Sequence, residues 1–413
     1  MTGARRAAAG AAVALLAVPA GHARAGGFLI YEQGPSALGQ AGAFVARADD
    51  PSAIFYNPAG LAAHPRLGVL AGVTAIISST TASRLQPAGT SSSSETRVFF
   101  PPTLYAAVPL PVLDGRVVAG LGAFTQYGLG MTWPADWPGR YQITGADARS
   151  INVNPTLSVR VLPRLWVGAG MSVVYAVLEL RRAVDLTQED GRIHMGGTAT
   201  AFGGNGGLLW EAIPDRLRLG LAYRSATHLR VDDGRADFTV PPEFSQQLRD
   251  QRVRSVIRTP HLVTAAASVR TAGQLRLSID VVYATWSSFE WFYFRFPDSS
   301  PEADLSTFER QDWNNTVSVR AGGELPIAEH WRVRGGLGYD PSPVPRDTLS
   351  PVIPDAARTY VSAGVSRDLG PVRAELSYML ALFSDRSSGL AAFPARYATT
   401  GHLIGAALQY RRP

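Results

Sequence analysis

Residues 217–224 read Leu-Arg-Leu-Gly-Leu-Ala-Tyr-Arg, and this short stretch contains the pattern that decides the fold. The apolar side chains fall at every second position, whereas the residues between them are small or charged. Successive side chains of a β-strand point to opposite faces, so the alternation is typical of a strand with one apolar and one polar face. The same alternation recurs over 151–161, 275–283, 331–339 and 372–380.

The lengths and spacing of these segments predict a membrane barrel. Many run for about 10–14 residues, which exceeds the usual soluble strand and suits a tilted membrane-crossing strand. Every second connection is tight: Pro111–Gly115, Leu162–Arg164, Ile213–Asp215, Thr271–Gly273, Pro326–Glu329 and Leu369–Pro371. Short turns alternating with long loops are typical of outer-membrane barrels. We therefore predict an all-β fold, a 14-stranded antiparallel transmembrane β-barrel; a soluble all-β protein is the alternative.

The composition agrees with a strand-built membrane protein. Only 17% of the residues are charged, against about 25% in soluble domains. The chain has 41 Gly and no Cys, which excludes a disulfide scaffold and thiolate metal sites. No run of 18 apolar residues occurs, so a membrane helix is not expected.

The first 25 residues have the features of a cleavable signal peptide. Arg5 and Arg6 precede an apolar stretch over 7–20, and Ala23-Arg24-Ala25 has the small-x-small pattern of a signal-peptidase site. We predict export with cleavage after Ala25, which lowers the formal net charge by three from +6. The remaining arginines are scattered rather than in basic runs, so no nucleic acid is expected as a partner.

Residues 26–66 do not follow the strand pattern. They are rich in small residues, and Pro51 and Asn57-Pro58-Ala59 favour turns. So short a segment cannot build a core alone, but it suits the lumen of a barrel with a polar, Gly-rich inner face. A disordered periplasmic tail is the alternative, which the apolar run Ile54-Phe55-Tyr56 disfavours. The predicted organisation is a signal peptide over 1–25, an N-terminal hatch (plug) over 26–66 and an outer-membrane β-barrel over 67–413.

Several motifs, in order along the chain, resemble those of one family. They are Gly27-Phe28, Gly39-Gln-Ala-Gly42, Asp49-Asp50, Asn57-Pro58-Ala59, Trp137-Pro-Gly-Arg-Tyr141, Asp280 with Trp286-Ser-Ser-Phe289, Asp312-Trp313, and Arg334 through Val344 with Pro354 and Arg358. Together they resemble the FadL/OmpP1/TodX family of outer-membrane transporters. The resemblance implies a fourteen-stranded barrel plugged by a hatch and passive uptake of long-chain fatty acids or hydrocarbons. Family members usually end on an aromatic residue, whereas here Arg411-Arg412-Pro413 follows Tyr410.

Uptake of a hydrophobic molecule requires apolar side chains on the external loops and along the route. The predicted ligand-binding residues are Phe28, Phe55, Phe124, Tyr127, Leu129, Met131, Trp133, Trp137, Arg140, Tyr141, Phe244 and Leu248. Within this set, Arg140 is the cation expected to hold a carboxylate head group, because it lies between Trp137 and Tyr141 and matches the family's motif. The alternatives are that these side chains only pack the loops together and that Arg140 pairs with Asp136 or Asp147.

Two small-residue elements are candidates for gating. The Asn57-Pro58-Ala59 turn is predicted to let the hatch move, and Gly128 and Gly130 lie where the third strand ends. In the family this strand is kinked inward and opens a lateral window. Glycines permit such a kink here, and they equally permit close packing of the hatch. We therefore expect substrate to leave sideways between strands.

No pattern in the sequence indicates an enzyme, and no metal or cofactor is expected. His-Glu-x-x-His, Gly-x-Ser-x-Gly and phosphate-loop motifs do not occur. The expected partners are a hydrophobic small molecule or fatty acid, outer-membrane lipid and lipopolysaccharide, bound by a monomer. A non-specific porin and an outer-membrane adhesin or receptor are the alternative functions.

Overall fold

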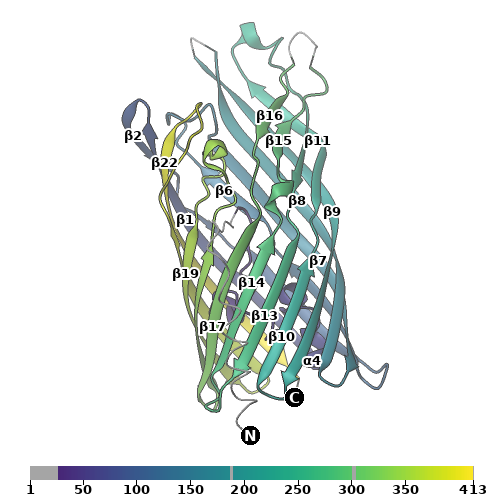
Figure 1. The fold of residues 1–413 in the computed structure, drawn as a ribbon. Coiled ribbons are helices and arrows are strands. Elements are labelled where there is room, and N and C mark those ends of the chain that lie inside the picture. Colours follow the sequence, from purple (N-terminus) through teal and green to yellow (C-terminus); the bar gives the residue numbers. More distant parts are fainter. Residues whose placement is uncertain (1–26, 187–188, 300–303, 413) are drawn as a thin grey trace.

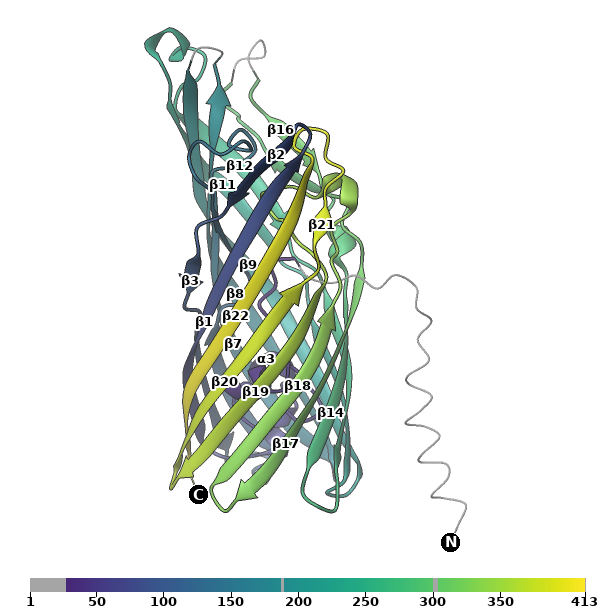
Figure 2. The same ribbon diagram turned by 90° about the vertical axis from the view of Figure 1, so that its left-hand side faces the viewer.

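The computed structural model describes residues 27–186, 189–299 and 304–412, so the predicted signal peptide lies outside the described residues. The chain forms a closed antiparallel barrel of 14 strands, as predicted (Figures 1 and 2). It closes where β1 (Gly68–Leu85) pairs with β22 (Ala395–Arg411) along almost their whole lengths. Within the described ranges, no helix has the length and apolar character needed to cross a membrane.

Most wall strands are continuous, and four are interrupted by a few residues. The continuous ones are β1, β7 (Gly145–Leu162), β8 (Leu165–Asp185), β9 (Asp190–Ile213), β14 (Arg276–Ala284), β17 (Thr316–Ala328), β18 (Trp331–Asp340), β19 (Arg358–Leu369), β20 (Val372–Phe383) and β22. The interrupted ones are β3 (Arg97–Phe99) with β4 (Pro102–Leu110), β5 (Val117–Phe124) with β6 (Gly128–Thr132), β10 (Leu217–Arg224) with β11 (His228–Thr239), and β12 (Gln251–Arg258) with β13 (Leu262–Arg270).

The remaining elements are short. In the external loops they are β2 (Ala88–Ser93), β15 (Trp291–Phe294), β16 (Thr307–Arg310), β21 (Arg386–Ser387) and the 3-10 turns η1 (Pro242–Phe244), η2 (Trp286–Ser288) and η4 (Arg346–Thr348). Near the N-terminus they are α2 (Pro35–Leu38), α3 (Ala53–Tyr56) and α4 (Gly60–Ala63).

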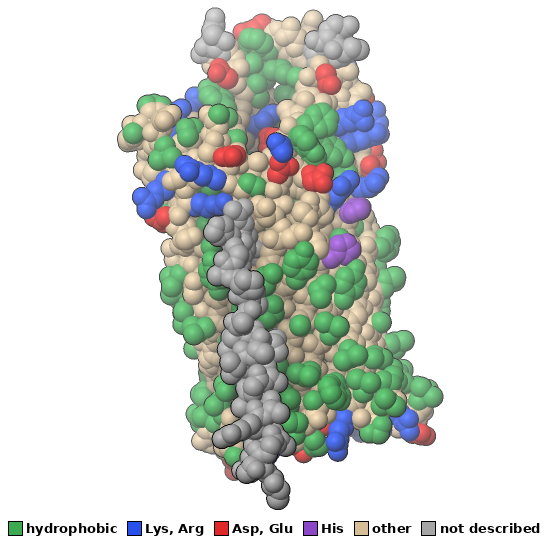
Figure 3. Space-filling model, in the orientation of Figure 1, with side chains coloured by type: hydrophobic (Ala, Val, Ile, Leu, Met, Phe, Trp, Pro, Cys, Tyr) green, Lys and Arg blue, Asp and Glu red, His purple; other side chains and the backbone are tan. Residues whose placement is uncertain are grey.

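The alternating pattern sorts side chains between lipid and lumen as predicted. In β10, Leu219, Leu221 and Tyr223 are exposed, whereas Gly220 and Arg224 face inward and are buried. On the face shown in Figure 3, apolar side chains cover the middle and lower barrel, while most charged groups gather at the upper end and a few lie along the lower edge. Exposed aromatic residues such as Tyr175, Tyr283, Trp331, Tyr339, Tyr378 and Tyr410 suit the membrane interfaces. Trp166 ends an apolar run of the sequence, which predicts a place at the membrane interface, and this prediction was wrong: it lies on the inward face of β8 with only 8% of its surface exposed.

The sequence pattern is misleading at the external end. It predicts loops over 180–196 and 229–254, which was wrong, because β8, β9 and β11 extend well into these segments. Above the membrane a hairpin has no lipid-facing side, so strict apolar alternation is not required there. The pattern also predicts a strand over 274–295, whereas β14 ends at Ala284 and Trp286-Ser-Ser forms η2.

Residues 27–66, which we call the luminal segment, lie inside the barrel (Figure 2). Helix α2 contacts β19, β20 and β22, while α4 contacts β5, β7 and β8, so the segment bridges opposite walls. Polar contacts fix it: Arg47 pairs with Glu324 at 2.7 Å, and Asp280 accepts the backbone N–H groups of Phe44 and Val45 at 2.9 Å each. This placement agrees with the hatch prediction; that the segment acts as a hatch stays a prediction.

Candidate functional site

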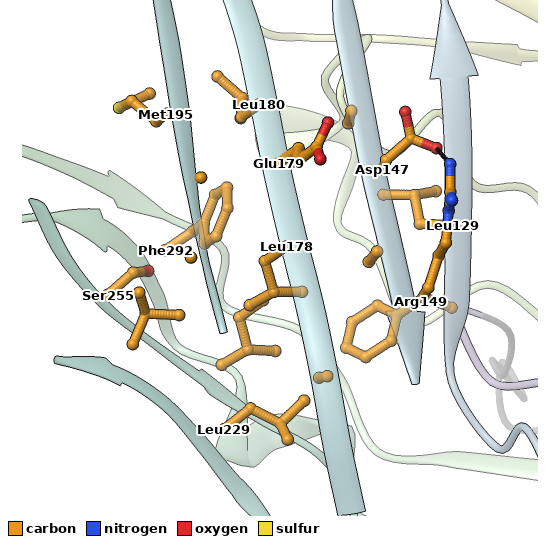
Figure 4. Close-up of a pocket in the computed structure, with 18 of the residues that line it drawn as sticks. Leu129, Asp147, Arg149, Leu178, Glu179, Leu180, Met195, Leu229, Ser255 and Phe292 are labelled. Atoms are coloured by element: carbon orange, nitrogen blue, oxygen red, sulfur yellow. Dashed lines mark hydrogen bonds and ion pairs between the residues drawn. The ribbon is translucent and has the colours of Figure 1, made fainter. Parts of the chain in front are cut away.

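An apolar cavity lies at the external end of the barrel, between β7, β8, β9, β11 and β12 on one side and loop side chains on the other. The empty space there, counted together with the solvent at its open mouth, is about 900 Å³. Leu178, Leu180, Met195 and Leu229 come from the wall strands and Phe292 from β15 (Figure 4). Among the described residues, the only charged groups on its lining are Asp147, Arg149 and Glu179, and Arg149 bonds to Asp147. We call this space the outer cavity; it suits an uncharged, flexible chain.

The barrel wall is broken beside this cavity. Strand β5 ends at Phe124, residues 125–127 turn inward, and β6 resumes at Gly128. In the described ranges β6 pairs with β7 and β3 pairs with β1, but no ladder joins β3 to β6. A side chain at Gly130 would overlap the ring of Phe99, which therefore occupies the opening. We call this break the wall gap; it is the kink that the family resemblance implied.

A second cavity, the gap cavity, extends inward from the wall gap. Its empty volume is about 1790 Å³, and Phe99, Gly128, Gly130 and Met131 line it. Six residues line both cavities, so the two are adjacent: Phe28, Leu129, Ala148, Arg149, Ser150 and Ile353. A hydrophobic molecule therefore has neighbouring spaces leading from the external end to the wall gap.

The start of the luminal segment separates these spaces. Leu29 forms an antiparallel β-bridge with Tyr127, and Ile30 N–H donates to the Gln126 carbonyl at 2.8 Å. The Phe28 ring packs among Tyr127, Trp286, Phe289 and Trp313 with centroid distances of 5.1–6.0 Å. Residues 28–30 thus lie as an extra strand beside the inward kink.

Arg358 is the cation that sequence reasoning did not select. It lines the gap cavity, its side chain is 13% exposed, and within the described structure it makes no hydrogen bond. The nearest carboxylate oxygen, Asp340 Oδ2, is 4.0 Å away and already accepts bonds from Arg320 and Tyr360. Asp355 lines the same cavity, and burial raises the pKa of its carboxyl. A buried guanidinium with unused donors suits a carboxylate ligand.

Arg140, the cation chosen from sequence, is engaged elsewhere. Its Nε donates to Asp190 at 2.5 Å and its Nη2 to the Tyr141 hydroxyl at 2.8 Å. Neither the outer nor the gap cavity has Arg140 on its lining. The structure thus corrects the choice of Arg140: it forms a loop ion pair, although with Asp190 and not with the two aspartates considered.

The structure brings some of the other predicted residues together and separates the rest. Phe28, Tyr127, Leu129 and Met131 line the cavities. Trp133 and Trp137 stack on each other at 4.2 Å, Phe55 and Phe124 pack at 5.4 Å in the luminal core, and Tyr141, Phe244 and Leu248 lie on the external loops. Leu178, Leu180, Met195, Phe289, Phe292 and Phe294 line the outer cavity and were missed. The run Phe289-Glu-Trp-Phe-Tyr-Phe294 was the available signal for three of them.

The Asn57-Pro58-Ala59 turn is held firmly in this conformation. Asn57 Nδ2 donates to the carbonyls of Val45 at 3.1 Å and Leu208 at 3.0 Å. Side chains at Gly168 or Gly207 would overlap the turn, so it packs directly on the wall backbone. These contacts anchor the turn in this conformation; that the turn shifts during uptake stays a prediction.

Fold and site together define a membrane-spanning barrel with a filled lumen. A family model described as "Outer membrane protein transport protein (OMPP1/FadL/TodX)" matches residues 16–378, and the chain belongs to this family. The "Long-chain fatty acid transport protein" of Escherichia coli O6:H1 is 25% identical over 394 residues, covering 86% of this chain and 85% of that protein. The "Putative outer membrane protein NMB0088" of Neisseria meningitidis is 25% identical with the same coverage of both chains.

Solved structures of similar fold agree. A Pseudomonas aeruginosa FadL homologue superposes with a TM-score of 0.84 at 18% identity, covering 93% of this chain and 99% of its own. The toluene transporter TodX of P. putida gives a TM-score of 0.72 at 17% identity, covering 91% and 99%. At these identities the likeness shows the fold alone. In the part of the chain that the structure describes, no group of His, Asp and Glu residues is placed to hold a metal ion.

Proposed function

We propose that this outer-membrane protein takes up hydrophobic molecules passively, by capture in the outer cavity, passage to the gap cavity and lateral release through the wall gap. The observation that carries the proposal is the adjacency of an apolar cavity to a break in the β-ladder. Relatives named for fatty-acid and toluene transport support this class of ligand.

The energetics suit passive transfer. Burial of an acyl chain stabilises it by about 0.8 kcal/mol per CH₂, so an apolar cavity extracts it from water without an energy source. Membrane lipid on the outer side of the wall gap is as apolar as the cavity, so transfer of the ligand from the cavity to the lipid requires little free energy. The exposed side chains of Phe100 and Leu104 flank this side of the wall.

The moving part is the start of the luminal segment, residues 28–30, and not the residues that follow. Residues 28–30 are held chiefly by a single β-bridge and ring contacts. By contrast, buried ion pairs anchor the rest of the luminal segment, residues 32–66, to the wall. Glu32 pairs with Arg320, and Arg47 pairs with Glu324. Displacement of residues 28–30 by an incoming ligand would join the two cavities.

The test is to fill the wall gap. Gly130→Leu and Gly128→Leu place bulk against Phe99 and Ile30, respectively, and are expected to reduce uptake of a radiolabelled long-chain fatty acid several-fold. Gly335→Leu is the matched control, because a side chain there meets only a backbone oxygen at 3.9 Å. Undiminished uptake by correctly assembled gap variants would exclude lateral release.

A further inference from the structure

A polar cavity lies at the opposite end of the lumen, beneath the luminal segment. Its empty volume is about 1550 Å³ up to its mouth, and Asp49, Gly60, Leu61 and His64 form its roof. The short hairpins and the C-terminus lie at this end (Figure 1), which is the periplasmic end of an outer-membrane barrel. We call this space the basal cavity; the proposed uptake route does not use it.

Arginine outnumbers acidic residues on its lining. The arginines are Arg47, Arg66, Arg216, Arg218, Arg270, Arg276, Arg332, Arg373 and Arg411, and the carboxylates are Asp49, Asp50, Glu211, Asp215 and Glu324. The excess on the lining is four positive charges, and Asp368, which is not on the lining but pairs with three of these arginines, reduces it to three. Low-dielectric walls focus such a field and raise the local anion concentration.

The strongest part of this field is an under-neutralised cluster. Asp368 accepts hydrogen bonds from Arg332 Nη1 at 2.7 Å, Arg373 Nε at 2.7 Å and Arg411 Nη2 at 2.5 Å. Three guanidinium groups therefore share one carboxylate, which leaves two positive charges uncompensated there. The Arg373 side chain is only 9% exposed, so water screens it weakly.

Further polar groups around the cavity are unused. Arg66, Arg216 and Arg270 stand at its rim, and their side chains make no hydrogen bond or ion pair with any described residue. The wall thus presents more hydrogen-bonding capacity than the protein itself uses.

We propose that the basal cavity is a periplasm-facing binding site for a multivalent oxyanion of the phosphate type. Guanidinium groups bind such anions bidentately, and the charge excess needs a multivalent partner. The source is either free phosphate or the head group of a phosphate-bearing lipid from the inner leaflet.

Anchoring of the luminal segment explains only part of this arginine set. Arg47 and Arg276 pair with Asp49 at 2.9 and 2.6 Å, and Arg47 also reaches Glu324, so these two arginines are neutralised. The Asp368 cluster lies on β18, β19, β20 and β22 and bonds to no residue of the luminal segment in the described structure. Anchoring of the luminal segment therefore does not explain the excess positive charge of the Asp368 cluster.

The experiment is calorimetric titration of the purified full-length mature chain in uncharged detergent with inorganic phosphate at constant ionic strength, with chloride as the reference ion. Wild type is expected to show saturable phosphate binding. Arg332→Gln combined with Arg411→Gln should weaken it by about tenfold or more, because two charge-assisted contacts are lost. Arg252→Gln, which breaks an external ion pair with Asp298, should bind as wild type does.

A second pair of variants guards against misfolding. Arg66→Gln and Arg270→Gln change exposed rim side chains without described partners, so the fold is retained while affinity falls. Tighter binding of dihexanoyl phosphatidic acid than of phosphate would identify a lipid head group as the natural ligand. Tighter binding of phosphate would identify the free ion. Phosphate heats no different from those of chloride, or equal affinity in all variants, would overturn the proposal.

Discussion

At the scale of single residues, we expect Arg358 to decide which ligands the gap cavity accepts. The Arg358 guanidinium makes no hydrogen bond to the described protein and lies over the rings of Phe383 at 5.5 Å and Tyr360 at 6.0 Å, and its ion pair with Asp340 is long, at 4.0 Å. A fatty acid supplies both an apolar chain and a compensating carboxylate, whereas toluene supplies only apolar surface.

Arg358→Gln is therefore expected to separate the two ligand classes. The loss of a charge-assisted bond of about 1.5–3 kcal/mol corresponds to roughly 10–100-fold weaker fatty-acid binding, with toluene binding unchanged. Arg358→Lys should restore part of the affinity, and Arg140→Gln should have no effect. Equilibrium binding with both ligands checks this; equal loss for both would show that Arg358 acts structurally.

Asp50 gives a pH dependence at the same scale. Burial, helped by the nearby charge of Glu375, raises the pKa of Asp50 from 3.8 to about 6. Its Oδ2 is buried without a hydrogen-bond partner among the described residues, so the protonated form is favoured in the folded state. The stabilisation of the folded state by protonated Asp50 is complete below pH 3.8 and is lost as the pH rises through about 6.

The melting temperature should consequently fall between pH 4 and pH 7. The difference in unfolding free energy is at most about 3 kcal/mol, at about 1.4 kcal/mol per pKa unit. Asp50→Asn should flatten the profile, while Asp114→Asn, in an exposed turn, should not alter it. A thermal unfolding series in detergent measures both; a wild-type profile in the Asp50 variant would contradict the assignment.

At the scale of elements, the bridge between residues 28–30 and the kink is the proposed moving contact. The chain has no Cys, so a pair introduced at Leu29 and Tyr127 forms a unique disulfide. Opposed residues of antiparallel strands have Cα atoms about 4.5–5.5 Å apart, within the range a disulfide spans. Oxidised Leu29→Cys/Tyr127→Cys should lose most uptake, and reduction should restore it.

The matched control places a disulfide where no movement is required. Thr81→Cys/Ser93→Cys joins β1 to β2, whose residues are paired in register. It should transport equally well in both redox states. If the oxidised bridge variant transports as well as its reduced form, residues 28–30 do not move during uptake.

The membrane-spanning strands were predictable from the sequence, whereas their external extensions and the cavity residues were not. The strand over 217–224 was predictable because lipid and lumen impose opposite polarities on alternate residues. The external extension of β8 and β9 was not, because outside the membrane that constraint ends. Arg140 was chosen for its sequence neighbours, whereas Arg358 lies in the gap cavity through contacts between distant segments, which periodicity does not encode.

At the scale of the whole molecule, the lumen is filled by charge pairing as much as by apolar packing. Arg334 bonds to Glu324 at 2.8 Å and Glu375 at 3.2 Å, and Arg320 bonds to Asp340 at 2.7 Å, all on the inner wall. The luminal segment covers these groups and excludes water from them. Without it, the same inner face would be a hydrated polar channel.

This difference separates hydrophobic uptake from the porin alternative. The full chain is expected to show low single-channel conductance in planar bilayers, and a chain lacking residues 27–66 a conductance larger by about an order of magnitude. Asn57→Ala, which retains the segment, is the control, and its single-channel conductance should stay low. Electrophoretic heat-modifiability verifies that the shortened barrel assembles. If it does not, liposome swelling with the full chain decides the same point, because sugar entry at a porin's rate would contradict a closed lumen.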